Sequence, residues 1–165
     1  MYKKLLNISP LISLILAAAV IIAMAKFYPK WEKPRTEATL SWDVMGYYLY
    51  LPATFIYNDL SELKFKDEII KKYGPTSSFY QAFQHKETGK YVMKYPIGQA
   101  VLYAPFFGLG HLYALMSDYP PDGFSLPYQA AISWGSIFIA FLGLWFFQKA
   151  LRAYFDPIIS GIVVL

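Results

Sequence analysis

Apolar residues gather in long runs along this chain, and most charged residues lie between the runs. Residues 1–27 contain an apolar run that is long enough to span a membrane, and residues 128–148 contain another. A further apolar segment begins at residue 157 and reaches residue 165 after about half the length that a span needs. The pattern predicts an all-α membrane protein, the N-terminal fragment of a polytopic helical bundle with a truncated last helix.

A cleaved signal peptide is the alternative interpretation of the first run. Its basic start, its apolar centre and the sequence Ala23-Met24-Ala25 before Lys26 match the small-x-small pattern at which leaders are cut. Because further apolar runs follow, and a polytopic protein needs no cleaved leader, we expect this segment to be retained as a transmembrane helix.

Residues 28–127 are predicted to form an extracytoplasmic loop with surface helices. The loop begins with aromatic residues, prolines and cations, a mixture that is typical of a membrane–water interface. Residues 44–60 are predicted to form an amphipathic helix on the bilayer surface, bent at Pro52. Further along, we expect a helix around residues 63–72 and a small hairpin with its turn at residues 87–89.

The apolar run at residues 97–116 either crosses the membrane or lies along its surface. If the N-terminal lysines are cytoplasmic and all three long runs cross, the later cations fall outside and the acidic loop at residues 117–127 falls inside, against the positive-inside rule. Inverting the whole chain removes this conflict, and so does a juxtamembrane position for this run. The second solution suits a run that contains Gln99, Pro105 and His111, because non-crossing helices tolerate such residues.

Composition narrows the class of protein further. Of the 165 residues, 56% are hydrophobic and 19% are aromatic, which is more than a soluble domain usually has. The sequence has no cysteine, which excludes disulfides and thiolate chemistry. The net charge of +4 is not gathered into a dense stripe of cations, so we expect contact with membrane lipids and no binding of nucleic acid.

Asp43 is the candidate functional residue of the loop. In a helix, Asp43, Tyr47 and Tyr50 share one face, because they are spaced i, i+4, i+7. A carboxylate among phenols beside a membrane suits a polar, charged headgroup. The spacing alone favours a structural interpretation: Ser41 is a good N-cap, an acid is stabilised in the first helical turn, and tyrosines are typical of an interfacial belt.

The two histidines and the short motifs add little. His85 and His111 have no partner at metal-ligand spacing, so we expect a loop residue and a helix-interface residue respectively. The sequence lacks a dinucleotide-binding glycine pattern, a phosphate-binding glycine loop, a zinc-protease motif and a nucleophile elbow. The common motifs of soluble enzymes therefore give no assignment.

The order of elements resembles the N-terminal module of GT-C-type glycosyltransferases that use polyprenyl-phosphate sugars, such as the protein O-mannosyltransferases and the aminoarabinose–lipid A transferases. Shared features are an N-terminal span, an acid early in a long external loop, a cation beside proline before an apolar helix, and a span that ends in cations. Asp43 matches the first-loop acid, although Val44 stands where the family often has Glu. Lys94-Tyr95-Pro96 is similar to the family's Lys-Pro-Pro. The stretches around these residues also resemble multi-pass membrane proteins of Bacteroidetes-like bacteria.

The resemblance implies a glycosyltransferase at the outer face of the bacterial inner membrane, with a lipid-linked sugar as donor. Asp43 is then the general base on the acceptor hydroxyl, or a ligand of a divalent cation such as Mg²⁺ or Mn²⁺. Lys94 stabilises the leaving phosphate, and Tyr47, Tyr50 and Tyr95 contact substrate. The alternative is a non-catalytic multi-pass membrane protein for transport, assembly or lipid or glycan binding, in which Lys94 only reaches lipid phosphates.

Overall fold

The computed structural model describes residues 2–165, with side chains from residue 10 onward. The chain divides into two compact units: a terminal unit, Met1–Pro29 with Ser136–Leu165, and a central unit, Lys30–Gly135. Most of the described chain is helical, as predicted, and a two-stranded hairpin is the exception to an all-α class.

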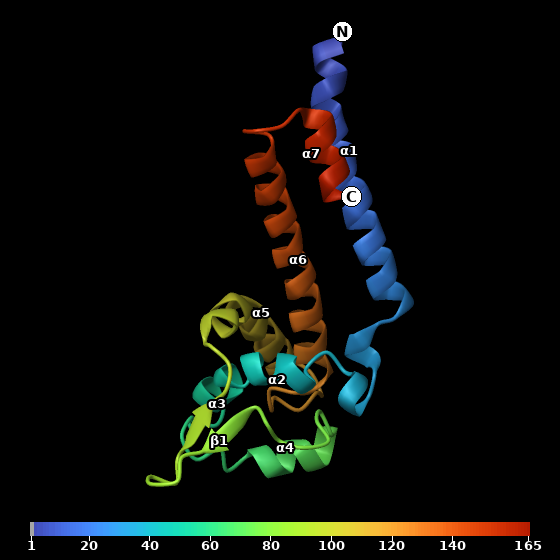
Figure 1. Cartoon of the computed structure of the whole chain (residues 1–165). Coiled ribbons are helices and arrows are strands. Elements are labelled where there is room, and N and C mark those ends of the chain that lie inside the picture. The colour runs from blue at the N-terminus through green and yellow to red at the C-terminus, as the bar shows by residue number, and fades with distance from the viewer. Residues whose placement is uncertain (1) are drawn as a thin grey trace. The chain divides into compact units, whose positions relative to one another are not determined.

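The terminal unit contains α1 (Tyr2–Phe27), α7 (Pro157–Val164) and the second half of α6 (Leu126–Leu151). Helices α1 and α7 pack side by side (Figure 1). Gln148, on α6, donates a hydrogen bond of 2.7 Å from its side-chain amide to the carbonyl of Pro10, and both residues are buried. This polar contact within an apolar unit ties α1 to α6.

In the part of the chain that the structure describes, two helices are long and apolar enough to cross a membrane, one over Pro10–Glu32 and the other α6. Only 11% of either apolar window is buried, whereas the core helix of a soluble protein is mostly buried. The structure therefore supports a membrane protein on the length and composition of these helices. The run predicted at residues 97–116 forms α5 (Gly98–Leu115), which is not one of the two.

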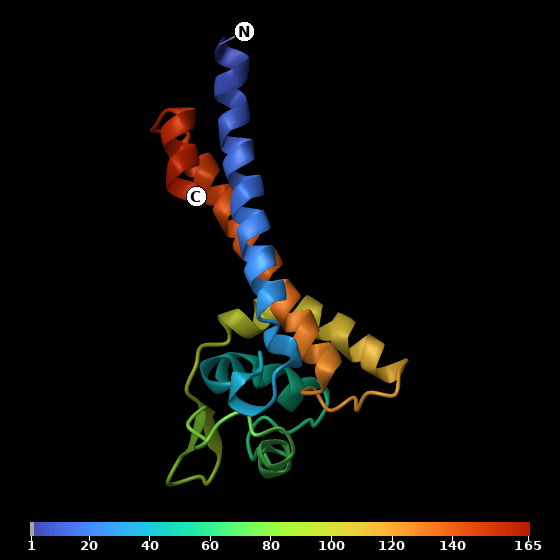
Figure 2. The same cartoon turned by 90° about the vertical axis from the view of Figure 1, so that its right-hand side faces the viewer.

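In the central unit, the predicted amphipathic helix of residues 44–60 is present as two short helices, α2 (Trp42–Tyr48) and α3 (Tyr50–Phe55). Both pack against α5 (Figure 2). The break falls at Leu49 and not at the predicted Pro52, because Pro52 lies in the first turn of α3, where a backbone N–H has no partner within the helix.

The apolar face of α2 and α3 points into the central unit. Tyr48, Leu49 and Ala53 are fully buried, and they pack in one cluster with residues of α5 and of the loop before α6. The expectation that this face rests on a bilayer is therefore wrong for most of its residues. The hydrophobic pattern is the same in both cases, since a bilayer and a protein core both take up apolar side chains.

The remaining elements are short. The predicted helix around residues 63–72 is α4, which begins three residues later than expected and ends at Gly74, a left-handed C-cap. The predicted hairpin is confirmed: Ala82 pairs with Met93, and Gly89 gives the turn its left-handed residue. The bounds are η1 (Lys30–Glu32), η2 (Arg35–Glu37), α4 (Lys66–Tyr73), β1 (Ala82–Gln84) and β2 (Tyr91–Met93).

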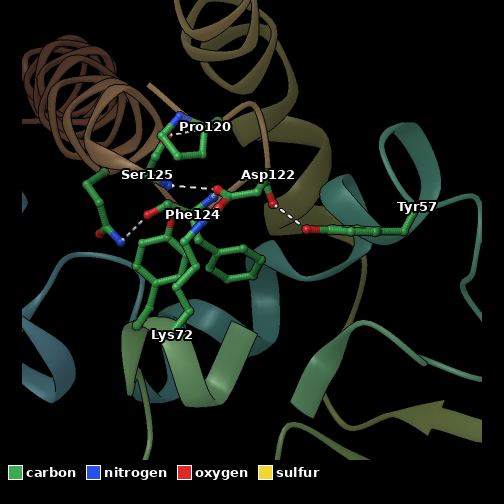
Figure 3. Close-up of polar contacts among 8 residues, drawn as sticks. Tyr57, Lys72, Pro120, Asp122, Phe124 and Ser125 are labelled. Atoms are coloured by element: carbon green, nitrogen blue, oxygen red, sulfur yellow. Dashed lines mark hydrogen bonds and ion pairs between the residues drawn. The ribbon is translucent and has the colours of Figure 1, made fainter. Parts of the chain in front are cut away.

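One carboxylate, that of Asp122, holds the loop between α5 and α6 (Figure 3). Its Oδ1 accepts hydrogen bonds from the backbone N–H groups of Phe124 at 2.9 Å and Ser125 at 3.1 Å. Its Oδ2 accepts from the ammonium of Lys72 at 2.8 Å and from the hydroxyl of Tyr73 at 2.5 Å. The Asp122 side chain is only 16% exposed, so these bonds form in a partly dry environment that strengthens them.

Backbone carbonyls of the same loop accept hydrogen bonds from two further phenols. The hydroxyl of Tyr57 donates to the Asp122 carbonyl at 3.0 Å, and that of Tyr48 donates to the Gly123 carbonyl at 2.5 Å. Burial, and then the Asp122 charge, raise the pKa of Tyr57 to about 12. Burial is also the main reason why the pKa values of Tyr48 and Tyr73 lie above the ordinary value.

Replacing Asp122 by alanine leaves two backbone N–H groups, a lysine and a phenol without their acceptor. Hydrogen bonds to a charged group contribute about 1.5–3 kcal/mol each in favourable cases, so we expect Asp122→Ala to lower the free energy of unfolding by at least about 2 kcal/mol. Urea unfolding in detergent micelles, followed by tryptophan fluorescence, measures this. The matched control is Asp118→Ala, an exposed acid in the same loop, and equal stability of the two variants would contradict the role of Asp122.

The raised tyrosine pKa values predict an alkaline instability. The folded protein keeps these phenol protons above the ordinary pKa of about 10, whereas the unfolded chain loses them, so stability is complete below about pH 10. It then falls as the pH rises, and for Tyr57 the fall continues to about pH 12. Thermal midpoints measured across this interval should decline, with a shallower decline for Tyr57→Phe; constant midpoints would contradict the network.

Candidate functional site

The side chain of Tyr95 lies against α2 of the central unit. A Cβ atom on Gly46 would lie 2.2 Å and 2.3 Å from two carbons of the Tyr95 ring, so only glycine permits this approach. The ring also contacts that of Tyr47, with 4.5 Å between the centroids and an interplanar angle of 51°. Tyr95 is therefore fixed along one face of α2.

Polar contacts around Tyr95 bring together the five residues predicted from the sequence. Its hydroxyl donates a hydrogen bond to the carboxylate of Asp43. The hydroxyl of Tyr50 donates to the carbonyl of Tyr95 at 2.5 Å, and the ammonium of Lys94 lies 5.0 Å from the centroid of the Tyr95 ring. With the ring contact of Tyr47, these interactions place the other four around Tyr95, and we call these five residues the Tyr95 cluster.

The carboxylate and the cation act on the phenol in opposite directions. The hydrogen bond to Asp43, and then burial, raise the pKa of Tyr95, whereas the neighbouring Lys94 lowers it. Tyr95 is thus protonated at neutral pH and donates to Asp43, which holds the carboxylate in one orientation. Asp43 and Lys94 are both exposed, so a ligand can reach each of them.

The start of α2 sets the position of Asp43. Trp42, the preceding residue, has a φ of 49°, which is uncommon for a residue other than glycine. Its N–H donates to the carbonyl of Pro75 at 3.1 Å, and its own carbonyl accepts from the side-chain amide of Gln81 at 3.1 Å. Asp43 therefore follows a backbone position that is held from both sides, and it lies in the first turn as predicted.

Ser41 takes the predicted N-cap position but not the predicted bond. Its hydroxyl donates to the carbonyl of Ala38 at 2.5 Å and makes no bond to an N–H group of α2. The serine thus stabilises the turn that leads into the helix. Asp43, in the first turn, is the acid whose negative charge stabilises the N-terminal end of α2.

Two residues that position the cluster were not predicted. Gln81 is 3% exposed, and its backbone carbonyl accepts a hydrogen bond from the N–H of Lys94 at 3.0 Å. Because its side-chain amide bonds Trp42, Gln81 links the start of α2 to the segment that carries Lys94 and Tyr95. Its sequence context gives no signal of this. Gly46 has a signal, because a glycine inside a helical pattern often marks a close approach by another segment.

The residues that the structure describes include no group of three or more His, Cys, Asp or Glu placed to hold a metal ion. His85 lies in the hairpin turn, 3.3 Å from the hydroxyl of Thr88, and His111 contacts the hydroxyl of Tyr128 at 2.5 Å between α5 and α6. Asp43 alone offers one carboxylate, which fits a Mg²⁺ ion that takes most of its oxygens from substrate phosphates and water.

No protein-family model, curated protein or solved structure matches this chain. The assignment of a function therefore rests on the geometry of the Tyr95 cluster and on the two apolar helices. Both are properties of the chain itself, and both are open to direct test.

The close approach of Tyr95 predicts that Gly46→Ala is costly. The added methyl group overlaps the ring, so either the ring or α2 must move, and overpacking of this kind destabilises by about 1–3 kcal/mol. The free energy of unfolding in detergent micelles measures the effect. Gly98→Ala is the matched control, because a Cβ there meets no atom within 4 Å; equal stability of the two variants would show that Tyr95 does not lie on α2.

Proposed function

We propose that this chain belongs to a membrane glycosyltransferase that takes its sugar from a polyprenyl-phosphate donor at the outer face of the bacterial inner membrane. The convergence of Asp43 and Lys94 on Tyr95 is the observation that supports this proposal best. A carboxylate and an ammonium at one exposed surface can accept a proton and stabilise negative charge. Those are the two functions that transfer of a sugar from a phosphate requires.

In the proposed reaction, Asp43 takes the proton of the acceptor hydroxyl while the hydroxyl oxygen bonds to the anomeric carbon of the sugar. The bond between that carbon and the phosphate oxygen breaks, and its electron pair leaves with the phosphate. Lys94 stabilises the charge that develops there. Tyr95 orients the carboxylate, and Tyr47 and Tyr50 are placed to contact the sugar.

A divalent cation is compatible with the same residues. Asp43 is the side chain that would hold Mg²⁺ or Mn²⁺, together with phosphate oxygens of the donor. Such an ion supplies further stabilisation of the charge on the leaving phosphate. Lys94 supplies part of that stabilisation in either case.

The helix α5 supports a location at the membrane surface. One side of α5 packs into the core of the central unit through Ala100, Tyr103 and Phe107. Other residues of α5 are apolar and exposed, among them Val101 and Leu109. A helix that is apolar on both its packed and its exposed sides suits the bilayer boundary, so we favour the juxtamembrane position for this run, with α1 and α6 as the spans.

A non-catalytic lipid- or glycan-binding membrane protein is the second candidate. It is favoured by the Tyr95–Asp43 hydrogen bond, because one oxygen of the carboxylate is already engaged by a phenol of the protein. In this case the Tyr95 cluster binds a polar headgroup and no bond is broken.

The two candidates differ in the effect of Asp43→Asn on sugar transfer. Membranes of cells that express the protein are supplied in turn with radiolabelled polyprenyl-phosphate mannose, glucose and aminoarabinose, and label in the acceptor fraction is counted. Loss of a general base lowers a rate about 100-fold or more, so we expect that loss for Asp43→Asn with normal membrane insertion. Asp118→Asn is the control. Full transfer by Asp43→Asn contradicts the proposed base, and no transfer by the wild type with any donor favours the binding role.

A further inference from the structure

A second candidate site lies in the central unit and contains none of the Tyr95 cluster. It is a cavity of about 320 Å³. Its walls come from the segment that follows α1, from the end of α4 and from the start of α6, and they include Trp31, Arg35, Tyr73, Leu126 and Gln129. Three segments far apart in the sequence thus line one cavity.

The cavity wall carries an excess of positive charge. Its charged side chains are Lys33, Arg35, Lys72 and Glu32. Lys72 is already paired with Asp122 at 2.8 Å. Arg35 forms no ion pair with any side chain that the structure describes. The guanidinium of Arg35 is therefore the group best placed to take up an anion.

The backbone at Arg35 is held in an uncommon conformation. Its φ is 54°, in the left-handed region that residues other than glycine rarely adopt. Gly74 lies beneath its side chain: a Cβ on Gly74 would be 3.3 Å from Cγ of Arg35. Backbone strain of this kind concentrates at functional positions, where the surrounding structure maintains it.

The cavity wall contains residues at one end of each candidate span. Trp31 follows shortly after α1, which ends at Phe27, and Leu126 is the first residue of α6. The ring of Trp31 contacts that of Trp134, with 5.3 Å between centroids, and such indole rings are typical of headgroup depth. If α1 and α6 cross the membrane, Trp31 and Leu126 lie at the ends of the spans, at the depth of lipid phosphates.

We infer that this cavity binds the phosphate group of an anionic lipid, with Arg35 as its principal ligand. The planar guanidinium donates two parallel hydrogen bonds to phosphate oxygens, which a lysine does not. Lys33 adds charge, and Trp31 lies against the less polar part of the headgroup. The inference rests on the proposed membrane location, but not on glycosyl transfer.

The experiment measures the binding of two probes to the purified protein in detergent. Phosphatidylglycerol is followed by native mass spectrometry, and inorganic phosphate by calorimetry. We expect Arg35→Gln to bind phosphatidylglycerol about tenfold more weakly and Arg35→Lys to lose less. Arg152→Gln, at the only other arginine of the sequence, should bind like the wild type. Loss confined to phosphatidylglycerol assigns the phosphate to a lipid, and an equal loss for both probes assigns a free phosphate ion.

Wild-type binding of both probes by a folded Arg35→Gln variant overturns the inference. If that variant does not fold, Arg35→Lys takes its place, and wild-type binding of phosphatidylglycerol by Arg35→Lys then overturns it. Carbonate extraction of the wild-type protein separates this result from a failure of the proposed function. Release from membranes contradicts the membrane location, whereas a retained protein whose binding is independent of Arg35 refutes only the cavity.

Discussion

The carboxylate of Asp122 is the constraint on which the central unit depends. Its two oxygens accept hydrogen bonds from two N–H groups of its own loop and from a cation and a phenol of α4. These bonds hold the loop against the helix. Carbonyls of the same loop take the hydroxyls of Tyr48 and Tyr57. A core this rich in phenols is stable when its buried hydroxyls find acceptors, and the described residues include no buried side-chain polar atom without a partner.

Helix α4 and the residues just after it link Asp122 to both candidate sites. Lys72 and Tyr73, which bind Asp122, also form a wall of the cavity that holds Arg35. Just beyond the helix, Pro75 accepts the N–H of Trp42 and so fixes the residue before Asp43. The cavity beside Arg35 and the Tyr95 cluster therefore share one framework.

Local patterns of the sequence predicted which helices and strands form, but they predicted less well what those elements pack against. The long helices and the hairpin follow from apolar runs and turn residues, which are local properties. The bend expected at Pro52 lies at Leu49. The apolar face expected on a bilayer is buried in the protein, because hydrophobic periodicity shows that a helix face is covered but does not show what covers it. The spacing of Asp43 and Tyr47 predicted one helix face, but the ring of Tyr95 on Gly46 joins segments some fifty residues apart, and only tertiary packing determines it.

We propose that Asp43 works at the non-cytoplasmic surface of a membrane crossed by α1 and α6. The sequence has no cysteine, so a single introduced thiol can be labelled with a membrane-impermeant maleimide in spheroplasts. Asp43→Cys is predicted to be labelled in intact spheroplasts, and Asp156→Cys, beyond the far end of α6, only after the membrane is permeabilised. Labelling of Asp43→Cys only after permeabilisation would contradict the account.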